Sequence, residues 1–137
     1  MPFDVVFIEP CFPANQREFV RALHAVGARI TGIGERPKES LDSDLRHWLT
    51  HYEQVKNVTD EGEVEKVVRW LQQRVLIDRL EAVVEAHVMC AAKVRERSQV
   101  PLLLFGYYNP ILAYGEARLV KDAKEKGVDG FLVVDLP

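Results

Sequence analysis

The chain has 137 residues, with 18 Lys and Arg against 21 Asp and Glu, so its formal net charge is −3. This mild acidity argues against a nucleic-acid partner, because a nucleic-acid-binding domain usually carries a concentrated basic patch. No apolar run approaches the roughly 18 residues that cross a bilayer, so no membrane partner is expected. The length falls well short of the roughly 250 residues of a complete (β/α)8 barrel.

The first part of the chain alternates short apolar runs with amphipathic segments. Asp4–Ile8 is a continuous, β-branched run, which is typical of a strand buried on both faces. A helical period follows it and ends at Gly27, a residue type that often terminates helices. The pattern predicts strands over residues 4–8, 29–33 and 52–58, and helices over residues 14–26 and 42–49.

The remainder continues the same alternation. Asp60 and Glu63 have capping-box spacing, and they predict a helix that runs to Val75. A second helical stripe from Leu80 to Val94 follows almost at once. Beyond it the sequence predicts strands over 100–107 and 130–134, a loop over 108–114 and a helix over 116–126.

Strands that alternate with helices indicate βαβ units and a mainly parallel sheet. Right-handed crossovers then place helices on both faces of that sheet. The sequence therefore predicts a single domain over residues 1–137, an α/β fold in the form of a three-layer α/β/α sandwich. Its five-stranded sheet has the order 3-2-1-4-5, with residues 100–107 as the fourth strand.

Two stretches near the C-terminus carry a specific resemblance. Residues 101–115 read Pro-Leu-Leu-Leu-Phe-Gly-Tyr-Tyr-Asn-Pro-Ile-Leu-Ala-Tyr-Gly, and residues 126–137 read Lys-Gly-Val-Asp-Gly-Phe-Leu-Val-Val-Asp-Leu-Pro. Both stretches, at this separation, closely resemble the tryptophan synthase alpha subunit. The resemblance covers about residues 98–137 and implies one strand-helix-strand unit from the middle of that family's TIM barrel.

The first part of the chain resembles something else. Residues 7–20 read Phe-Ile-Glu-Pro-Cys-Phe-Pro-Ala-Asn-Gln-Arg-Glu-Phe-Val, which is similar to the domain that precedes the ATP-grasp fold. Residues 77–88 read Ile-Asp-Arg-Leu-Glu-Ala-Val-Val-Glu-Ala-His-Val and resemble the helix that closes that domain. This second resemblance covers about residues 3–96 and implies a Rossmann-like segment.

Neither family is expected to continue into the other. We therefore interpret the chain as a non-catalytic, engineered chimera of residues 1–97 and 98–137, with its seam between Val94 and Val100. A natural gene fusion is the alternative origin. Two other functions stay open: a truncated or degenerate alpha-like lyase that cleaves indole-3-glycerol phosphate, and an ATP-grasp N-terminal domain that docks with partner subunits.

The alpha-subunit resemblance implies three remnant residues of a substrate pocket. Tyr107 and Asn109 match positions that line the family's pocket, and Asp135 stands at the carboxyl end of a strand, where barrel sites are built. The alternative for Asp135 is a strand-end carboxylate that caps a turn. The resemblance also implies that the catalytic carboxylates and the phosphate loops lie on other barrel strands. General acid–base catalysis needs both carboxylates on the reacting bonds, so no catalytic residue is assigned.

The predicted strand order also implies a crevice at the carboxyl ends of strands 4–8 and 100–107. Glu9, Pro10 and Cys11 would supply one side of it, and Tyr107, Tyr108 and Asn109 the other. Nearby helix N-termini would favour an anion there, although Glu9 opposes one.

The other chemistry-bearing residues suggest no cofactor and no metal. Gly32-Ile33-Gly34 is not the GxGxxG of dinucleotide-binding loops, because Pro37 stands where the third glycine belongs, and it is interpreted as a turn. His47 and His51 are four residues apart but have no third ligand near them. Cys11 and Cys90 are expected to be free thiols, which fits a reducing cytoplasm.

Overall fold

The computed structural model describes residues 2–101 and 103–135, which form two compact units. Unit 1 spans Met1–Val100 and unit 2 spans Pro101–Pro137. The strands are β1 (Asp4–Ile8), β2 (Arg29–Gly34), β3 (His51–Gln54), β4 (Arg79–Glu81), β5 (Leu103–Tyr107) and β6 (Gly130–Val134). The α-helices are α1 (Gln16–Ala25), α2 (Ser43–Trp48), α3 (Glu61–Gln72), α4 (Glu85–Ser98), α5 (Tyr108–Tyr114) and α6 (Glu116–Glu125), and η1 (Lys38–Ser40) is a 3₁₀ turn. The prediction of one cooperative domain stays a prediction.

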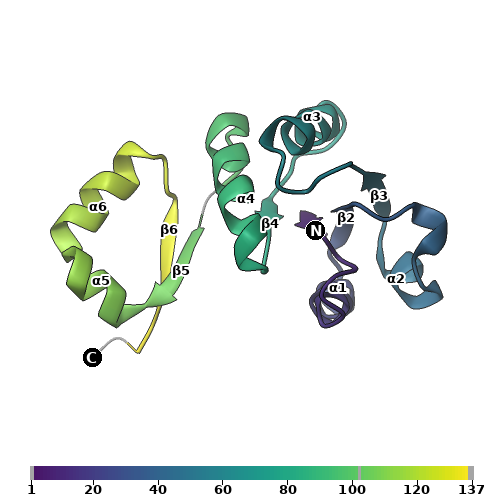
Figure 1. The fold of residues 1–137 in the computed structure, drawn as a ribbon. Coiled ribbons are helices and arrows are strands. Elements are labelled where there is room, and N and C mark those ends of the chain that lie inside the picture. The colour runs from purple at the N-terminus through teal and green to yellow at the C-terminus, as the bar shows by residue number, and fades with distance from the viewer. Residues whose placement is uncertain (1, 102, 136–137) are drawn as a thin grey trace. The chain divides into compact units, whose positions relative to one another are not determined.

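Unit 1 is a Rossmann-like α/β fold, as the sequence predicts. Its sheet has four parallel strands in the order β3-β2-β1-β4 (Figure 1). The fourth strand, however, is not the one predicted. Residues 79–81 pair with Val5–Phe7 and take the place that was assigned to residues 100–107. Among the described residues, β5 and β6 form a separate two-stranded parallel sheet, so the prediction of a single five-stranded sheet is wrong.

The strand β4 replaces the first turn of a predicted helix. Apolar residues around Leu80 do recur at helical spacing, but this segment forms a strand because it pairs with β1. Asp78 fixes the start of this strand, because its backbone N–H donates to the Asp4 carbonyl at 2.9 Å. Its carboxylate in turn accepts the Asp4 N–H at 2.8 Å. The chain between α3 and β4 is therefore a true break.

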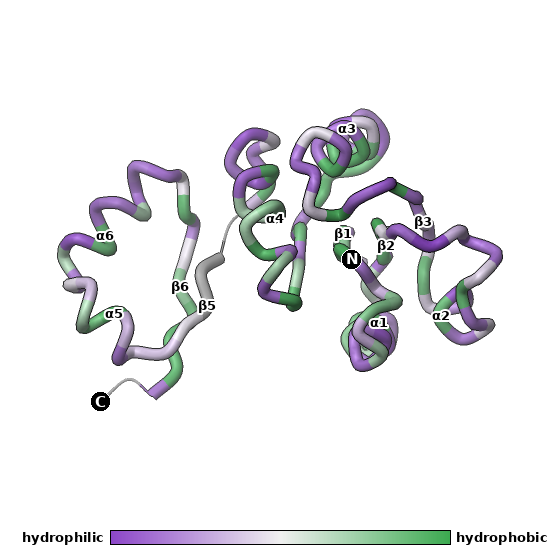
Figure 2. Tube along the Cα trace, viewed as in Figure 1, coloured by the Kyte–Doolittle hydropathy of each residue, from purple (hydrophilic) through white to green (hydrophobic). Residues whose placement is uncertain are grey.

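Alternate residues of β1 enter two separate hydrophobic cores, which makes unit 1 a three-layer sandwich. Val6 and Ile8 join the core that contains residues of α3 and α4. Val5 and Phe7 join the core that contains Val20 of α1 and residues of α2. Figure 2 shows hydrophobic residues along the central strands and hydrophilic ones on the outer side of α3. This double burial is what a continuous apolar strand predicts.

The amino ends of three strands are tied together around Asp4. Besides its hydrogen bonds with Asp78, Asp4 accepts a hydrogen bond from the Nε–H of Arg29 at 2.9 Å. It also forms an ion pair with the same guanidinium. Arg29 opens β2, and its backbone N–H donates to the Phe3 carbonyl at 2.9 Å. β1, β2 and β4 therefore start in a fixed register.

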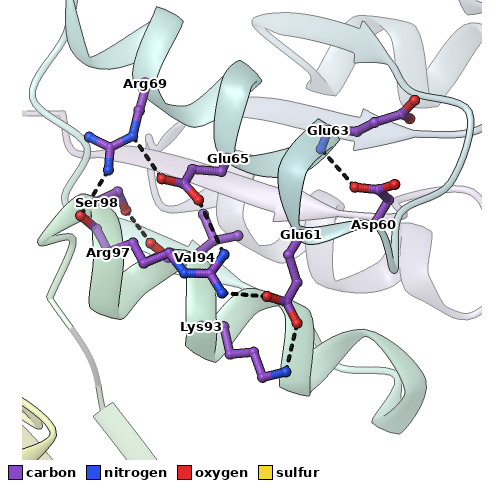
Figure 3. Close-up of polar contacts among 9 residues, drawn as sticks. All are labelled: Asp60, Glu61, Glu63, Glu65, Arg69, Lys93, Val94, Arg97 and Ser98. Carbon is purple, nitrogen blue, oxygen red and sulfur yellow. Dashed lines mark hydrogen bonds and ion pairs between the residues drawn. The ribbon is translucent and has the colours of Figure 1, made fainter.

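Helices α3 and α4 are joined by ion pairs across their exposed faces (Figure 3). Glu61 accepts from Lys93 at 2.6 Å and from Arg97 at 2.6 Å. Glu65 accepts from Arg69 at 2.8 Å and from Arg97 at 3.3 Å. Beneath them, apolar residues of both helices share one core. The helix α4 is thereby an integral part of unit 1.

Unit 2 contains the parallel pair β5–β6 and the helices α5 and α6 (Figure 1). Residues 108–114, predicted as a loop, form α5, which follows β5 directly. The helix α6 ends as predicted, because Gly127 takes a left-handed φ of 71° after its last turn. The register pairs Tyr107 with Val134, so the residues that follow both strands emerge at the same edge.

Candidate functional site

A buried carboxylate organises the carboxyl edge of the sheet in unit 1. Glu9, directly after β1, has a left-handed φ of 56° and is only 5% exposed. Its two carboxylate oxygens accept the backbone N–H of Cys11 at 3.3 Å and that of Glu35 at 3.2 Å. Its own N–H donates to the Ile33 carbonyl at 2.6 Å. One side chain therefore fixes the loops that follow β1 and β2.

The Tyr52 ring fixes the second of these loops from the other side. Its hydroxyl donates to the Arg36 carbonyl at 2.7 Å. The ring reaches this position because Gly34 has no side chain: a Cβ there would lie 2.5 Å from the tyrosine oxygen. At Gly32 a Cβ would lie 3.0 Å from Pro10 and 3.1 Å from the ring. The Gly-x-Gly pair thus lies inside β2 and makes room for Tyr52, so its interpretation as a turn is wrong.

Cys11 is a neutral thiol rather than an activated nucleophile. Burial, followed by the nearby Glu9 carboxylate, raises the pKa of Cys11 to about 11, and Arg36 only partly offsets this. Burial, followed by Cys11 and Glu9, also raises the pKa of Tyr52. Both groups stay protonated at neutral pH. Since the thiolate is the reactive form of cysteine, this edge has no activated thiol.

Above these loops lies a hollow of about 230 Å³. Its apolar wall includes Leu41 and Leu45, which are both buried. Two arginines from different elements line it, Arg17 from α1 and Arg36 from the loop after β2. The complete lining is Pro10, Cys11, Ala14, Arg17, Arg36, Ser40, Leu41, Asp42 and Leu45. The hollow therefore combines an apolar wall with two cations.

The structure divides the predicted crevice residues between the two units. It brings Glu9 and Cys11 together at the end of β1, whereas Tyr107 and Tyr108 belong to unit 2. The crevice was predicted from a strand order with residues 100–107 beside β1. Since β4 lies there, that premise is wrong. The proposed roles of the individual residues stay predictions.

The remnant pocket residues gather at the carboxyl edge of unit 2. Tyr107 ends β5 and is 58% exposed, and Asn109 lies in the first turn of α5. Asp135 follows β6 with a left-handed φ of 57°. Tyr108 instead donates its hydroxyl to Glu116 at 2.6 Å, and this hydrogen bond raises the pKa of Tyr108.

The histidines lie apart from these edges. His47 belongs to α2, where its ring lies 5.5 Å from that of His24, whereas His51 opens β3. His51 Nε2 lies 2.6 Å from a Glu53 carboxylate oxygen. Within residues 2–101 and 103–135, no group of three or more His, Cys, Asp or Glu side chains is arranged to hold a metal ion. No helix of the described part is long and apolar enough to cross a membrane.

Sequence reasoning named Pro10 and Cys11 but missed the other residues that line the hollow. Among them are Arg17, Arg36 and Ser40, which no motif in the sequence marks. The one available signal was the position of Arg36, two residues after the glycine that ends β2. In parallel sheets, loops at this edge are where ligands bind.

Comparisons with known proteins divide the chain at an earlier point than the boundary between the two units. The family model of the tryptophan synthase alpha chain matches residues 76–137. That match begins earlier than residue 98, and it includes β4 and α4 of unit 1. The resemblance predicted from the last two motifs is therefore confirmed and extends further towards the N-terminus.

Curated relatives agree with the family model. The tryptophan synthase alpha chain of Citrifermentans bemidjiense is 56% identical over 46 residues, which are 34% of this chain and 17% of that protein. The alpha chain of Pelobacter propionicus is 48% identical over 69 residues, or 50% of this chain and 23% of that protein. The matched part thus spans about a fifth of the length of these relatives.

Solved structures show the fold of the chain. The structure described as AtPrR2 with NADP⁺ and (+)pinoresinol has a TM-score of 0.62 at 13% identity, and the match covers 97% of this chain and 50% of that one. The Bordetella bronchiseptica enzyme WbmH, solved with NAD⁺, has a TM-score of 0.56 at 11% identity, over 97% and 56% of the two chains. At such low identity, these matches support a Rossmann-like α/β fold and nothing more specific.

Proposed function

We propose that the chain is a non-catalytic fusion of two α/β fragments: a Rossmann-like part that resembles the domain preceding ATP-grasp folds, and a tryptophan synthase alpha-like part. The observation that carries this proposal is the extent of the family match. It covers residues 76–137, whereas β1, β2 and β3 lie outside it and form a sheet with the Rossmann order. An engineered join is the origin that we propose, because neither family is expected to continue into the other.

The residues of unit 2 support the absence of catalysis. Asp135 is exposed at the end of β6, and Tyr107 is exposed beside it at the end of β5. General acid–base catalysis needs two groups that are held on the reacting bonds. The matched alpha chains are about five times longer than the part aligned here, so most of the residues that surround their sites have no counterpart in this match.

The cofactors named for the structural neighbours are not proposed for this chain. Glycines after the first strand let a dinucleotide's pyrophosphate approach the backbone. Here the same loop, residues 9–15, reads Glu-Pro-Cys-Phe-Pro-Ala-Asn and contains no glycine. Its two prolines lack N–H donors, and the N–H of Cys11 already donates to Glu9. This loop does not suit a pyrophosphate.

A second candidate function is residual lyase activity, which the alpha-chain match favours. An assay of indole release from indole-3-glycerol phosphate at high protein concentration distinguishes the two functions. The fusion proposal predicts release no faster than in a blank without protein. Indole release that exceeds the blank, and that Asp135→Ala abolishes, would establish the lyase instead. Asp129→Ala, on the loop before β6, is the matched control for this substitution.

We also propose that the fusion folds as one cooperative domain. A two-stranded sheet such as β5–β6 is marginal by itself in water. Native-state hydrogen exchange measures this directly, and a cooperative chain protects the amides of β1 and β5 to similar degrees. Free exchange in residues 103–107, with residues 4–8 fully protected, would show that the units fold separately.

A further inference from the structure

We propose that the hollow at the carboxyl ends of β1 and β2 is a binding site for a small phosphomonoester with an apolar body. This inference concerns unit 1 alone and goes beyond the proposed fusion. It rests on four features of the hollow. One arginine has no ion-pair partner among the described residues, and a second is held by carboxylates that a ligand can replace. The loops are fixed before a ligand binds, and the wall is apolar.

Arg36 is the uncompensated cation. It lines the hollow and is exposed, and within the described residues its guanidinium forms no ion pair. Arginine presents its donors in a rigid fork that matches carboxylate and phosphate oxygens. A cation that lines a hollow without a protein partner is suited to an anionic ligand.

Arg17 is the second cation, and it is held by replaceable partners. Its guanidinium lies 3.3 Å from carboxylate oxygens of both Asp42 and Asp44. These contacts are long for charge-assisted hydrogen bonds, which usually measure about 2.7–2.9 Å. The Asp44 side chain is 66% exposed, so exchange of this partner for a ligand costs little desolvation. A phosphate dianion can accept hydrogen bonds from both Arg17 and Arg36.

The loops that carry these groups are positioned before any ligand arrives. Glu9 holds the backbone at Cys11 and Glu35, and Tyr52 holds the carbonyl of Arg36. Ser40 on the rim is fixed by its hydroxyl, which donates to the Pro37 carbonyl at 2.7 Å. Preorganisation of this kind lowers the entropic cost of binding.

The size and wall of the hollow define the ligand class. About 230 Å³ lies below the roughly 300–1,000 Å³ of typical pockets, so a ligand the size of a dinucleotide is too large. Pro10, Leu41 and Leu45 supply apolar surface beside the two cations. A compact ring or short carbon chain that carries one phosphate group fits both parts.

Two carboxylates, those of Asp42 and Glu9, lie in the lining of the hollow or beneath it. Asp42 lines the hollow, but it is engaged by Arg17 and by the N–H of Leu45 at 2.9 Å. Glu9 lies beneath the hollow, where its oxygens accept backbone N–H groups. Cys11 contributes a neutral thiol. Arg36 is therefore the cation of the lining that no described carboxylate pairs with before a ligand binds.

The test is a titration of the full chain with phenyl phosphate, followed by amide NMR. The expected result is saturable shifts confined to residues 10–17 and 36–45, which weaken as salt is added. Inorganic phosphate is expected to bind the same residues more weakly, because it lacks the apolar body, and phenol is expected not to bind. Shifts with phosphate alone, unaffected by Arg36→Gln, would mean an adventitious ion only and would overturn the proposal.

Three variants sharpen this test. Arg36→Gln is expected to weaken phenyl phosphate binding about tenfold or more, since a charge-assisted pair is lost. Asp44→Asn is expected to tighten it, because Arg17 is partly released. Arg21→Gln makes the same charge change one turn along α1, where Arg21 pairs with Glu18 and does not line the hollow.

Equal weakening by Arg21→Gln and Arg36→Gln would reduce the effect to net charge and overturn the site. Benzoate bound as tightly as phenyl phosphate would overturn the phosphate assignment. Because Arg36 is exposed and contributes its backbone carbonyl to Tyr52, Arg36→Gln keeps that hydrogen bond. Thermal unfolding of each variant verifies that the fold is retained.

Discussion

Strands β1 and β6 have nearly the same composition but very different surroundings. β1 reads Asp-Val-Val-Phe-Ile, and Val5 to Ile8 are at most 2% exposed. β6 reads Gly-Phe-Leu-Val-Val, yet Phe131 is 39% and Leu132 60% exposed. An apolar run thus indicates that a segment forms a strand, while the number of neighbouring layers determines how deeply that strand is buried.

The difference follows from the partners of each strand. β1 pairs with β2 on one side and β4 on the other, and it has a hydrophobic core on each face. β6 pairs with β5 in the described structure, and a hollow of about 200 Å³ opens beside Phe131 and Val133 towards residues of α5 and α6. A parallel sheet is normally covered on both faces, so the two units differ in packing rather than in sequence character.

The largest expected effect compares one leucine from each sheet. Leu80→Ala in β4 removes a fully buried side chain and is expected to destabilise the protein by about 2–5 kcal/mol. Leu132→Ala in β6, at 60% exposure, is expected to cost less than about 1 kcal/mol. Urea unfolding of both variants measures the difference. Equal losses would show that Leu132 is covered in solution.

A glycine pair gives the next largest effect. Gly34→Ala forces the Tyr52 hydroxyl away from the Arg36 carbonyl, with an expected cost of about 1–3 kcal/mol. Gly106→Ala in β5 meets no atom within 4 Å and is expected to be nearly neutral. Adding Tyr52→Phe to Gly34→Ala should recover part of the loss, because it removes the clashing oxygen. A full loss in the double variant would place the strain elsewhere.

Among the described residues of unit 1, side-chain helix caps are present at α2 and α3 and absent at α1 and α4. Asp60 caps α3 by accepting the Glu63 N–H at 3.0 Å, whereas the described N-caps of α5 and α6, Tyr107 and Gly115, make no side-chain cap bond. Asp60→Ala is expected to cost about 1 kcal/mol in thermal unfolding. Asp60→Asn, which keeps an acceptor oxygen, is the control and should restore most of the stability.

The smallest effect concerns the ion pairs between α3 and α4. Hydrogen bonds from Lys93 and Arg97 lower the pKa of Glu61, and those from Arg69 and Arg97 lower that of Glu65. Groups with a lowered folded pKa stabilise the protein above the ordinary carboxyl pKa and lose this contribution as the pH falls through the folded pKa. The wild type should therefore lose more stability between pH 7 and about pH 3 than Glu61→Gln/Glu65→Gln does. Added salt should shrink the difference, and an unchanged difference would contradict the prediction.

Local signals in the sequence predicted much of the fold. The run at residues 4–8, the Asp60 cap and the glycine at 27 all mark elements that the structure contains. The errors occurred where tertiary contacts compete with a local period. Leu80 fits a helical stripe, but its backbone pairs with Val6. Residues 108–114 contain a proline and an asparagine typical of loops, yet they form a helix.

The candidate site was less predictable, because it depends on contacts between distant residues. Glu9 and Cys11 were correctly singled out as neighbours at a strand end. The approach of Tyr52 to Arg36 joins residues 16 positions apart through a space left by Gly34. No local pattern encodes that approach. The residues of the hollow therefore emerge only once the order of β1, β2 and β3 is known.

The cluster around Asp4 has a consequence for how this sheet tolerates change. It fixes the alignment of β1, β2 and β4 at the amino edge, at the opposite end of the strands from the Glu9 loop. A one-residue slip would turn every side chain of a strand to the wrong face, and this cluster opposes it. The residues that align the strands and the residues proposed to bind a ligand therefore lie at opposite ends of the strands. The rim that carries Arg36 is free to diversify by substitution, as loops on a rigid scaffold do, while the framework beneath it stays the same.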